Sequence, residues 1–87
     1  MRIDRYLHCI RLAKSRTAAQ ALVHGGHIRV DRKRILKCAE EVCAGQVIAL
    51  PLHGVIRVLR ITALPARRGP AVEALRHYEE VGAPTSD

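Results

Sequence analysis

The segment from Lys14 to Val30 constrains the fold more than any other part of the sequence. Ser15 is a favourable N-cap, because its hydroxyl can accept a hydrogen bond from a backbone N–H of the first helical turn. Alanine, leucine and valine then form one apolar face. Gly25 or Gly26 can take the left-handed conformation that ends a helix. Ile28-Arg29-Val30 alternates apolar and basic residues, as a half-buried strand does. The segment therefore predicts a capped helix, a glycine stop and a strand.

The start of this predicted helix is also a candidate anion site. The first turn of a helix carries unpaired N–H groups and a partial positive charge. Lys14 and Arg16 flank that turn, and Arg16, Gln20 and His24 recur at a spacing of four residues on a polar face. This arrangement favours a phosphate group as the ligand.

Positive charge is concentrated in the first part of the chain. The 87 residues carry a net charge of +7. Residues 1–37 hold ten Lys and Arg against two Asp, a net charge of +8, whereas residues 38–87 hold five against six acidic residues, a net charge of −1. A basic half joined to a near-neutral half is typical of a surface that binds a polyanion. The alternative is a basic surface that is merely solvated.

Periodicity predicts a first helix from Asp4 to Ala13. Its apolar stripe recurs at i, i+3, i+4 and i+7, and its outward face carries Asp4, His8 and Arg11. With the strands below, this predicts an α+β fold. Two short N-terminal helices pack on a small, mostly antiparallel sheet, and a C-terminal helix follows.

The remaining elements are predicted from turn residues and β-branched runs. Residues 31–34 form a basic turn whose geometry is left open, because the Asn-Gly or Asp-Gly pair of a two-residue hairpin is absent. Residues 35–38 are predicted as a short returning strand, residues 40–46 as a loop that turns at Gly45, and residues 47–50 as a strand bounded by Pro51. Residues 55–62 are predicted as a strand, with a helix left open. A final helix runs from Pro70 to about Val81 and buries Val72, Leu75 and Tyr78.

The cysteines and the absence of long apolar runs indicate a cytoplasmic protein. Cys9, Cys38 and Cys43 fit neither a disulfide framework nor paired zinc ligands, so we expect free thiols, with Cys9 in the core. No run is long enough to cross a membrane, and the first residues lack the apolar block of a signal peptide.

Several motifs resemble one family when they are taken in order. They are Arg2-Ile3-Asp4-Arg5-Tyr6-Leu7, Lys14-Ser15-Arg16, Gly26-His27-Ile28-Arg29-Val30-Asp31 and A-G-Q-V-I-A-L. The first three resemble the R-L-D-x-x-L start, the basic-Ser-Arg turn and the G-x-V-x-V-N strand of the RNA-binding domain named after ribosomal small-subunit protein S4. The resemblance implies the S4-like αL motif over residues 1–50, with residues 51–87 completing the same small domain.

The later run V-I-R-V-L-R-I-T-A-L-P-A-R-R-G-P is similar to one branch of this group, the bacterial fifteen-kilodalton heat-shock proteins. That resemblance implies a bacterial source. It also implies binding to ribosomal RNA of large subunits that keep a stranded nascent chain and tRNA after translation aborts, and hence a role in stress or stalled-translation recycling.

Charge, the anion site and the resemblance together predict an RNA-binding surface. Such a surface would read the shape and backbone of A-form RNA, because the deep groove hides the bases. With two tyrosines as the only aromatic residues, stacking on single strands is disfavoured. No cofactor is expected. The predicted contact residues are Arg2, Arg5, Arg11, Lys14, Ser15, Arg16, Thr17, Gln20, His27, Arg29, Arg32, Lys33 and Arg34.

Other functions are less favoured by the sequence. No nucleophile motif, phosphate loop or pair of carboxylates at useful spacing indicates an enzyme. His24-Gly25-Gly26-His27 with a cysteine is a weak zinc candidate, because no second ligand pair is present. The loop Arg67-Arg68-Gly69-Pro70 and the final helix leave a protein-interaction module open. DNA binding also stays open, because contacts to phosphates discriminate poorly between polyanions.

Overall fold

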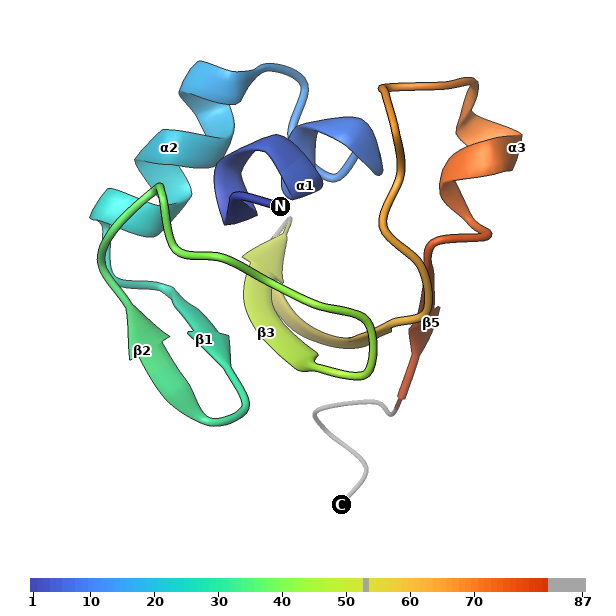
Figure 1. Ribbon diagram of the computed structural model, residues 1–87. Helices are drawn as coiled ribbons and strands as arrows, with labels where there is room; N and C mark the ends of the chain where they lie inside the picture. The colour runs from blue at the N-terminus through green and yellow to red at the C-terminus, as the bar shows by residue number, and fades with distance from the viewer. Residues whose placement is uncertain (53, 82–87) are drawn as a thin grey trace.

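Two helices cover one face of an antiparallel sheet in the computed structural model, which describes residues 1–52 and 54–81 (Figure 1). The elements in chain order are α1 (Ile3–Cys9), α2 (Arg16–His24), β1 (Ile28–Val30), β2 (Lys33–Ile35), β3 (Val47–Leu52), β4 (Val55–Ile61), α3 (Ala71–Ala74) and β5 (Tyr78–Glu80). The sheet order is β2-β1-β3-β4-β5, and every neighbouring pair is antiparallel. The predicted α+β class is confirmed.

The core lies between α1, α2 and the inner face of the sheet. The predicted apolar stripe of the first helix is fully buried, as are Ile48, Leu50, Leu59 and Ile61 of the sheet. Cys9 is also buried, as predicted. Tyr6 keeps its hydroxyl satisfied by donating to the carbonyl oxygen of His77 at 2.8 Å, so α1 is tied to the segment before β5. Burial raises the pKa of the Tyr6 hydroxyl well above its usual range.

The segment from Lys14 to Val30 folds as its sequence predicts. The Ser15 hydroxyl accepts a hydrogen bond from the backbone N–H of Ala18 at 3.0 Å, which caps α2. Gly26 has a φ of +73°, which suits glycine after a helix end. In β1, buried residues flank exposed Arg29. All of these features depend on residues close in sequence.

The first helix is shorter than predicted, and Asp4 was wrongly placed on its outward face. α1 ends at Cys9, and Arg11 adopts a φ of +66°, which turns the chain toward α2. The Arg11 guanidinium donates to the carbonyl oxygen of Gly69 at 2.7 Å, a contact that stabilises the turn. Asp4 is fully buried, because polar groups from α2 and the N-terminus surround its carboxylate.

The predicted position of the returning strand was also wrong. Asp31 and Arg32 have φ values of 50° and 72°, the positive sign that type I′ hairpins require at both central residues. Lys33 therefore pairs directly with Val30, and β2 covers 33–35 rather than 35–38. The Asp31 carboxylate accepts from the backbone N–H of Val47 at 3.0 Å, which fixes the turn against β3.

The second half of the sheet departs further from the prediction. β3 continues through Pro51, whose missing N–H is tolerated because β1 pairs with β3 only at Ile48 and Ala49. Residues 55–61 form a strand, as predicted. The final helix is wrong in length, since α3 ends at Ala74 and residues 78–80 form β5.

The length of the final helix was predicted wrongly because β4 offers an unpaired edge of the sheet. Glu79 and Glu80 pair with Arg60 and Arg57 of β4, so strand addition replaces the predicted last turns of helix. Val72 and Leu75, predicted to be buried, are 69% and 64% exposed.

Candidate nucleic-acid interface

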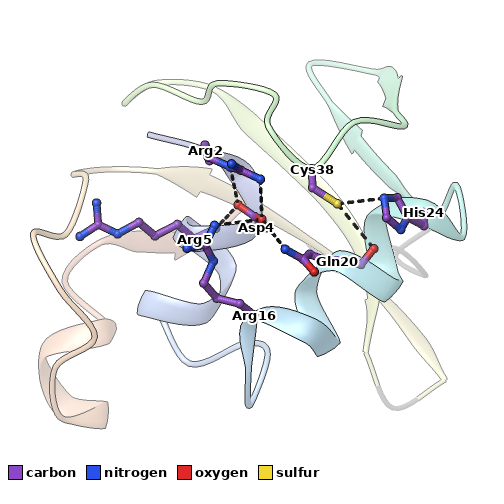
Figure 2. A network of polar contacts seen from close by, with 7 residues as sticks. All are labelled: Arg2, Asp4, Arg5, Arg16, Gln20, His24 and Cys38. Atoms are coloured by element: carbon purple, nitrogen blue, oxygen red, sulfur yellow. Dashed lines mark hydrogen bonds and ion pairs between the residues drawn. The ribbon is translucent and has the colours of Figure 1, made fainter.

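A buried carboxylate organises the basic residues at the start of the chain. Asp4 accepts hydrogen bonds from Arg2 at 3.1 and 3.2 Å, from Arg16 at 3.2 Å and from the Gln20 amide at 3.1 Å. The backbone N–H of Arg5 donates to the same carboxylate at 2.7 Å. Figure 2 shows these groups converging on Asp4 from α1, α2 and the N-terminus. We call Asp4, Arg2, Arg16 and Gln20 the Asp4 cluster.

The solvent-facing side of the Asp4 cluster carries a net positive charge. Burial raises the pKa of Asp4, but the hydrogen bonds from Gln20, Arg16, Arg2 and Arg5 lower it more, and the net pKa lies below its usual value. Asp4 is therefore ionised at neutral pH. The side chains of Arg2 and Arg16 remain 46% and 45% exposed, so each guanidinium is held on one side and open to solvent on the other.

The N-terminus of α2 lies in the same region. Ser15 uses its hydroxyl on the N–H of Ala18, and the carbonyl of Ser15 accepts from Ala19. In the described part of the chain, the backbone N–H groups of Arg16 and Thr17 have no hydrogen-bond acceptor. These two donors point out of a nine-residue helix and are flanked by guanidinium groups, which is the geometry that phosphate favours.

Three more arginines tie the loop of residues 66–69 to α1. Arg5 donates to the carbonyl oxygen of Ala66 at 2.8 Å, and Arg11 donates to that of Gly69 at 2.7 Å. In return, Arg68 donates to the carbonyl oxygen of His8 at 3.0 Å. Arg5 and Arg11, both predicted RNA contacts, therefore also have structural roles.

The imidazole of His8 lies in the positive field of these arginines. Burial lowers the pKa of its imidazole, and nearby Arg68, Arg16 and Arg11 lower it further. Arginines from the N-terminal part of the chain and Arg68, far along it, thus gather around the junction of α1 and α2. We call this junction, with the Asp4 cluster, the helix elbow.

A hollow on the other flank of α2 continues the elbow. Its cationic lining comes from Arg11, Lys14 and Arg68, and its apolar lining includes Leu22 and Leu52. The His27 ring also lines it and packs over Gly25, where a Cβ would lie 2.7 Å from the ring. The structure therefore brings together Arg11, Lys14 and His27, three of the predicted contacts.

The hairpin carries the other predicted cations, and it divides them between two faces. Arg29 and Arg34 are cross-strand neighbours whose side chains lie on the sheet face away from the helices, because Ile28 and Val30 face inward. Lys33 pairs with Val30 and lies on the helix side. Arg32 occupies the tip and, with Arg29, lines a hollow over β3 and β4.

The predicted contacts therefore form two groups rather than one continuous surface. The elbow lies at the N-terminal end of α2, and the hairpin lies beyond its C-terminal end (Figure 1). The nine residues of α2, about 14 Å long, separate the two groups. Sequence reasoning missed Arg68 and the central role of Asp4. The spacing of Arg16 and Gln20 marked a polar face but did not reveal the carboxylate that it meets.

Two other site classes gain no support from the described residues. Among them, no three His, Cys, Asp or Glu side chains gather as metal ligands would. None of the described helices has the length and apolar character needed to span a bilayer.

Comparisons with known proteins agree with this geometry. Small ribosomal subunit protein uS4 of Listeria monocytogenes is 43% identical over 49 residues, and that of Lacticaseibacillus casei is 49% identical over 49 residues. Each match covers 56% of this chain but 24% of the relative, so the chain matches about a quarter of these proteins' length.

Solved structures match over nearly the whole chain. The structure of Vibrio cholerae Heat Shock Protein 15, described as trimeric, has a TM-score of 0.89 and 28% identity, covering 94% of this chain and 82% of that one. The solution structure of hypothetical protein HP1423 has a TM-score of 0.78 and 26% identity, covering 94% and 98%. The S4 domain model matches residues 1–48, more than half of the sequence. The chain therefore belongs to the S4 domain family, a family of RNA-binding domains.

Proposed function

We propose that this protein binds structured RNA through its sugar-phosphate backbone, with the helix elbow as the anchor. The observation that supports this most is the buried Asp4 carboxylate, which holds Arg2 and Arg16 beside the free N–H groups of α2. Guanidinium groups that are already oriented lose less side-chain freedom when a phosphate binds. The same region offers two backbone donors and the Lys14 ammonium.

The proposed contacts are assigned by their position. Phosphates dock at the elbow on Arg2, Lys14, Arg16 and the N–H groups of Arg16 and Thr17, while Ser15 and Gln20 keep α2 and Asp4 in place. Arg5, Arg11 and His27 line the flanks of the same region. At the hairpin, Arg32 and Lys33 reach a second phosphate run, and Arg29 and Arg34, on the outer face of the sheet, contact a separate segment of the folded RNA.

Such a surface recognises helical shape rather than base sequence. Tyr6 is fully buried and Tyr78 is half-buried, so neither offers an open stacking platform. A-form RNA presents its backbone and 2′-hydroxyls across a wide, shallow groove, which a positively charged ridge can follow. The two cation groups at opposite ends of α2 fit contacts to both sides of such a groove.

We further propose that the RNA is ribosomal and belongs to the large subunit, and that the protein acts in the cytoplasm on subunits left by stalled translation under stress. The support is the likeness to Heat Shock Protein 15 over 94% of the chain, together with ribosomal relatives over 49 residues and the S4 domain match over residues 1–48. No catalytic step is part of this proposal.

Charge reversal tests the proposal. We expect Arg16→Glu, and the double variant Arg32→Glu with Lys33→Glu, each to weaken binding to structured ribosomal RNA severalfold at moderate salt. The matched control is Arg76→Glu, an exposed arginine in the segment between α3 and β5 that forms no side-chain ion pair among the described residues. Affinity would be measured by filter binding, with circular dichroism to verify folding.

Salt dependence gives a second readout. If about six phosphates are engaged, the logarithm of affinity falls with the logarithm of salt concentration at a slope of roughly −4 to −5. Equal affinities for the elbow variant, the hairpin variant and the Arg76 control would reject the proposed surface. Comparing isolated large and small subunits as ligands would separate the ribosomal assignment from RNA binding in general.

A further inference from the structure

A cysteine and a histidine form a close pair at the C-terminal end of α2. The thiol sulfur of Cys38 lies 3.2 Å from Nε2 of His24 and 3.8 Å from the backbone carbonyl oxygen of Gln20. Figure 2 shows the Cys38 sulfur joined by dashed lines to the His24 ring and to the backbone oxygen of Gln20. Cys38 lies in the loop after β2, so the contact joins residues fourteen positions apart.

The three cysteines differ sharply in their surroundings. Cys9 is buried in the core at 4% exposure, and Cys43 is exposed. Among the described residues, Cys38 alone has its sulfur within hydrogen-bond distance of an imidazole. Cys38 is half-buried and His24 is exposed, so a small reagent can reach the sulfur and the ring can exchange a proton with water.

His24 lies in the last turn of α2, where Nε2 of its ring faces the Cys38 sulfur. An imidazole that takes the thiol proton at this position would form a thiolate–imidazolium pair, and the thiolate is the nucleophilic form of cysteine.

We propose that Cys38 is a reactive thiol that His24 activates, and that hydroperoxides modify it. In the reaction, the Cys38 sulfur attacks one oxygen of hydrogen peroxide and the O–O bond breaks. The proton held by His24 passes to the leaving hydroxide, which departs as water. The sulfur is oxidised to a sulfenic acid and the peroxide is reduced, so no further reactant is needed.

The site borders the proposed RNA interface without being part of its chemistry. Gln20 contacts Cys38 through its backbone carbonyl and Asp4 through its side-chain amide. Reactivity at Cys38 can be measured without RNA, so its test is independent of the proposed function.

Competitive alkylation tests the assignment inside one molecule. The intact protein is treated with limiting iodoacetamide at pH 7, and mass spectrometry gives the labelling rates of Cys38 and Cys43. Although Cys38 is less exposed, we expect it to react about tenfold faster than Cys43, because an ordinary thiol is only a few per cent thiolate at this pH. Trapping with dimedone after dilute peroxide should label Cys38 first.

Two histidine variants separate activation from exposure. His24→Gln should bring the Cys38 rate down to that of Cys43 or below, while Cys43 itself is unchanged. His77→Gln, which alters a histidine whose ring contacts the carbonyl oxygen of Glu73 instead of a thiol, should leave both rates as they were. Slower reaction of Cys38 than of Cys43 in the native protein would overturn the proposal. So would an unchanged ratio in a folded His24→Gln variant.

Discussion

The helix elbow and the hairpin are both basic, but only the elbow holds its cations in hydrogen bonds and ion pairs. At the elbow, Arg2 and Arg16 are held by a buried carboxylate, and Arg5, Arg11 and Arg68 donate to carbonyl oxygens. At the hairpin, none of the basic side chains forms an ion pair or side-chain hydrogen bond with the described residues. One region fixes its cations in place, and the other leaves them exposed to solvent without partners among the described residues.

This difference gives the two regions different roles: the elbow positions a phosphate, and the hairpin attracts it. A held guanidinium meets a phosphate in a defined geometry, and it keeps free N–H donors after Asp4 has used some of them. A long basic side chain in solvent contributes its charge but loses up to about 2 kcal/mol of rotamer freedom when it is fixed by a ligand. We therefore expect the elbow to set the orientation of the bound RNA and the hairpin to add strength that depends on salt.

The largest expected effect comes from Asp4→Asn. The substitution keeps the shape but removes the charge that Arg2 and Arg16 share, and it places an amide N–H₂ among hydrogen-bond donors. Because both arginines are about half exposed, water compensates in part. We expect a loss of about 2 kcal/mol in the free energy of unfolding, measured in urea. RNA affinity should fall severalfold.

The matched control is Asp31→Asn at the hairpin, which removes the same charge. Asparagine can still accept the N–H of Val47 and is favoured in this kind of turn, so stability should change by less than about 0.5 kcal/mol. Equal losses in the two variants would contradict the contrast between the two regions.

Lowering the pH tests whether the charge of Asp4 stabilises the elbow. The folded pKa of Asp4 lies below its unfolded value near 3.8, so the stabilisation is complete above that pH and is lost as pH falls through the lower, folded pKa. The stability gap between the native protein and Asp4→Asn should therefore narrow on acidification below about pH 4. A gap that is independent of pH would mean that the carboxylate charge is not what stabilises the elbow.

A smaller effect is expected from exchanging arginine for lysine in each region. Arg16→Lys keeps the charge but loses the planar fork that contacts Asp4 and leaves donors for phosphate, so RNA affinity should fall about three- to tenfold. Arg32→Lys keeps the point charge that the hairpin supplies and should change affinity by less than about twofold. Fluorescence anisotropy with one RNA measures the affinities of both variants. Similar losses of affinity would contradict the proposed difference between the elbow and the hairpin.

The smallest effect is a gain in stability from Arg32→Gly. Arg32 has a φ of 72°, which strains a residue with a Cβ, so glycine should raise the free energy of unfolding by up to about 1 kcal/mol. The same change removes one phosphate contact, and the salt slope of RNA binding should become shallower by about 0.7 to 0.9. A loss of stability would show that the arginine makes compensating contacts in the turn.

Local sequence patterns were sufficient to predict some helices and strands but not others. Ser15, Gly26 and the alternation in β1 act within a few residues, so α2 and its neighbours were predictable. Residues 70–81 were predicted as one helix from their composition. They form α3 and β5 instead, because β4 offers an unpaired edge and two arginines that match Glu79 and Glu80. That edge lies nearly twenty residues away, beyond the reach of a local pattern.

The candidate site shows the same division. Its basic residues were recognisable from charge and from the motifs of the first 50 residues. Their sorting into an elbow and a hairpin was not, because it depends on the pairing of Arg29 with Arg34 and on the return of Arg68 to α1.

The sequence by itself determined the capped helix, the glycine stop, the apolar stripe of α1 and the excess of cations, because each arises from neighbouring residues. The tertiary structure decided that Asp4 is buried, that Arg2 and Arg16 share its carboxylate, and that Cys38 meets His24. These contacts join groups far apart in the chain, and their strength depends on the exclusion of water, which only the packed fold produces.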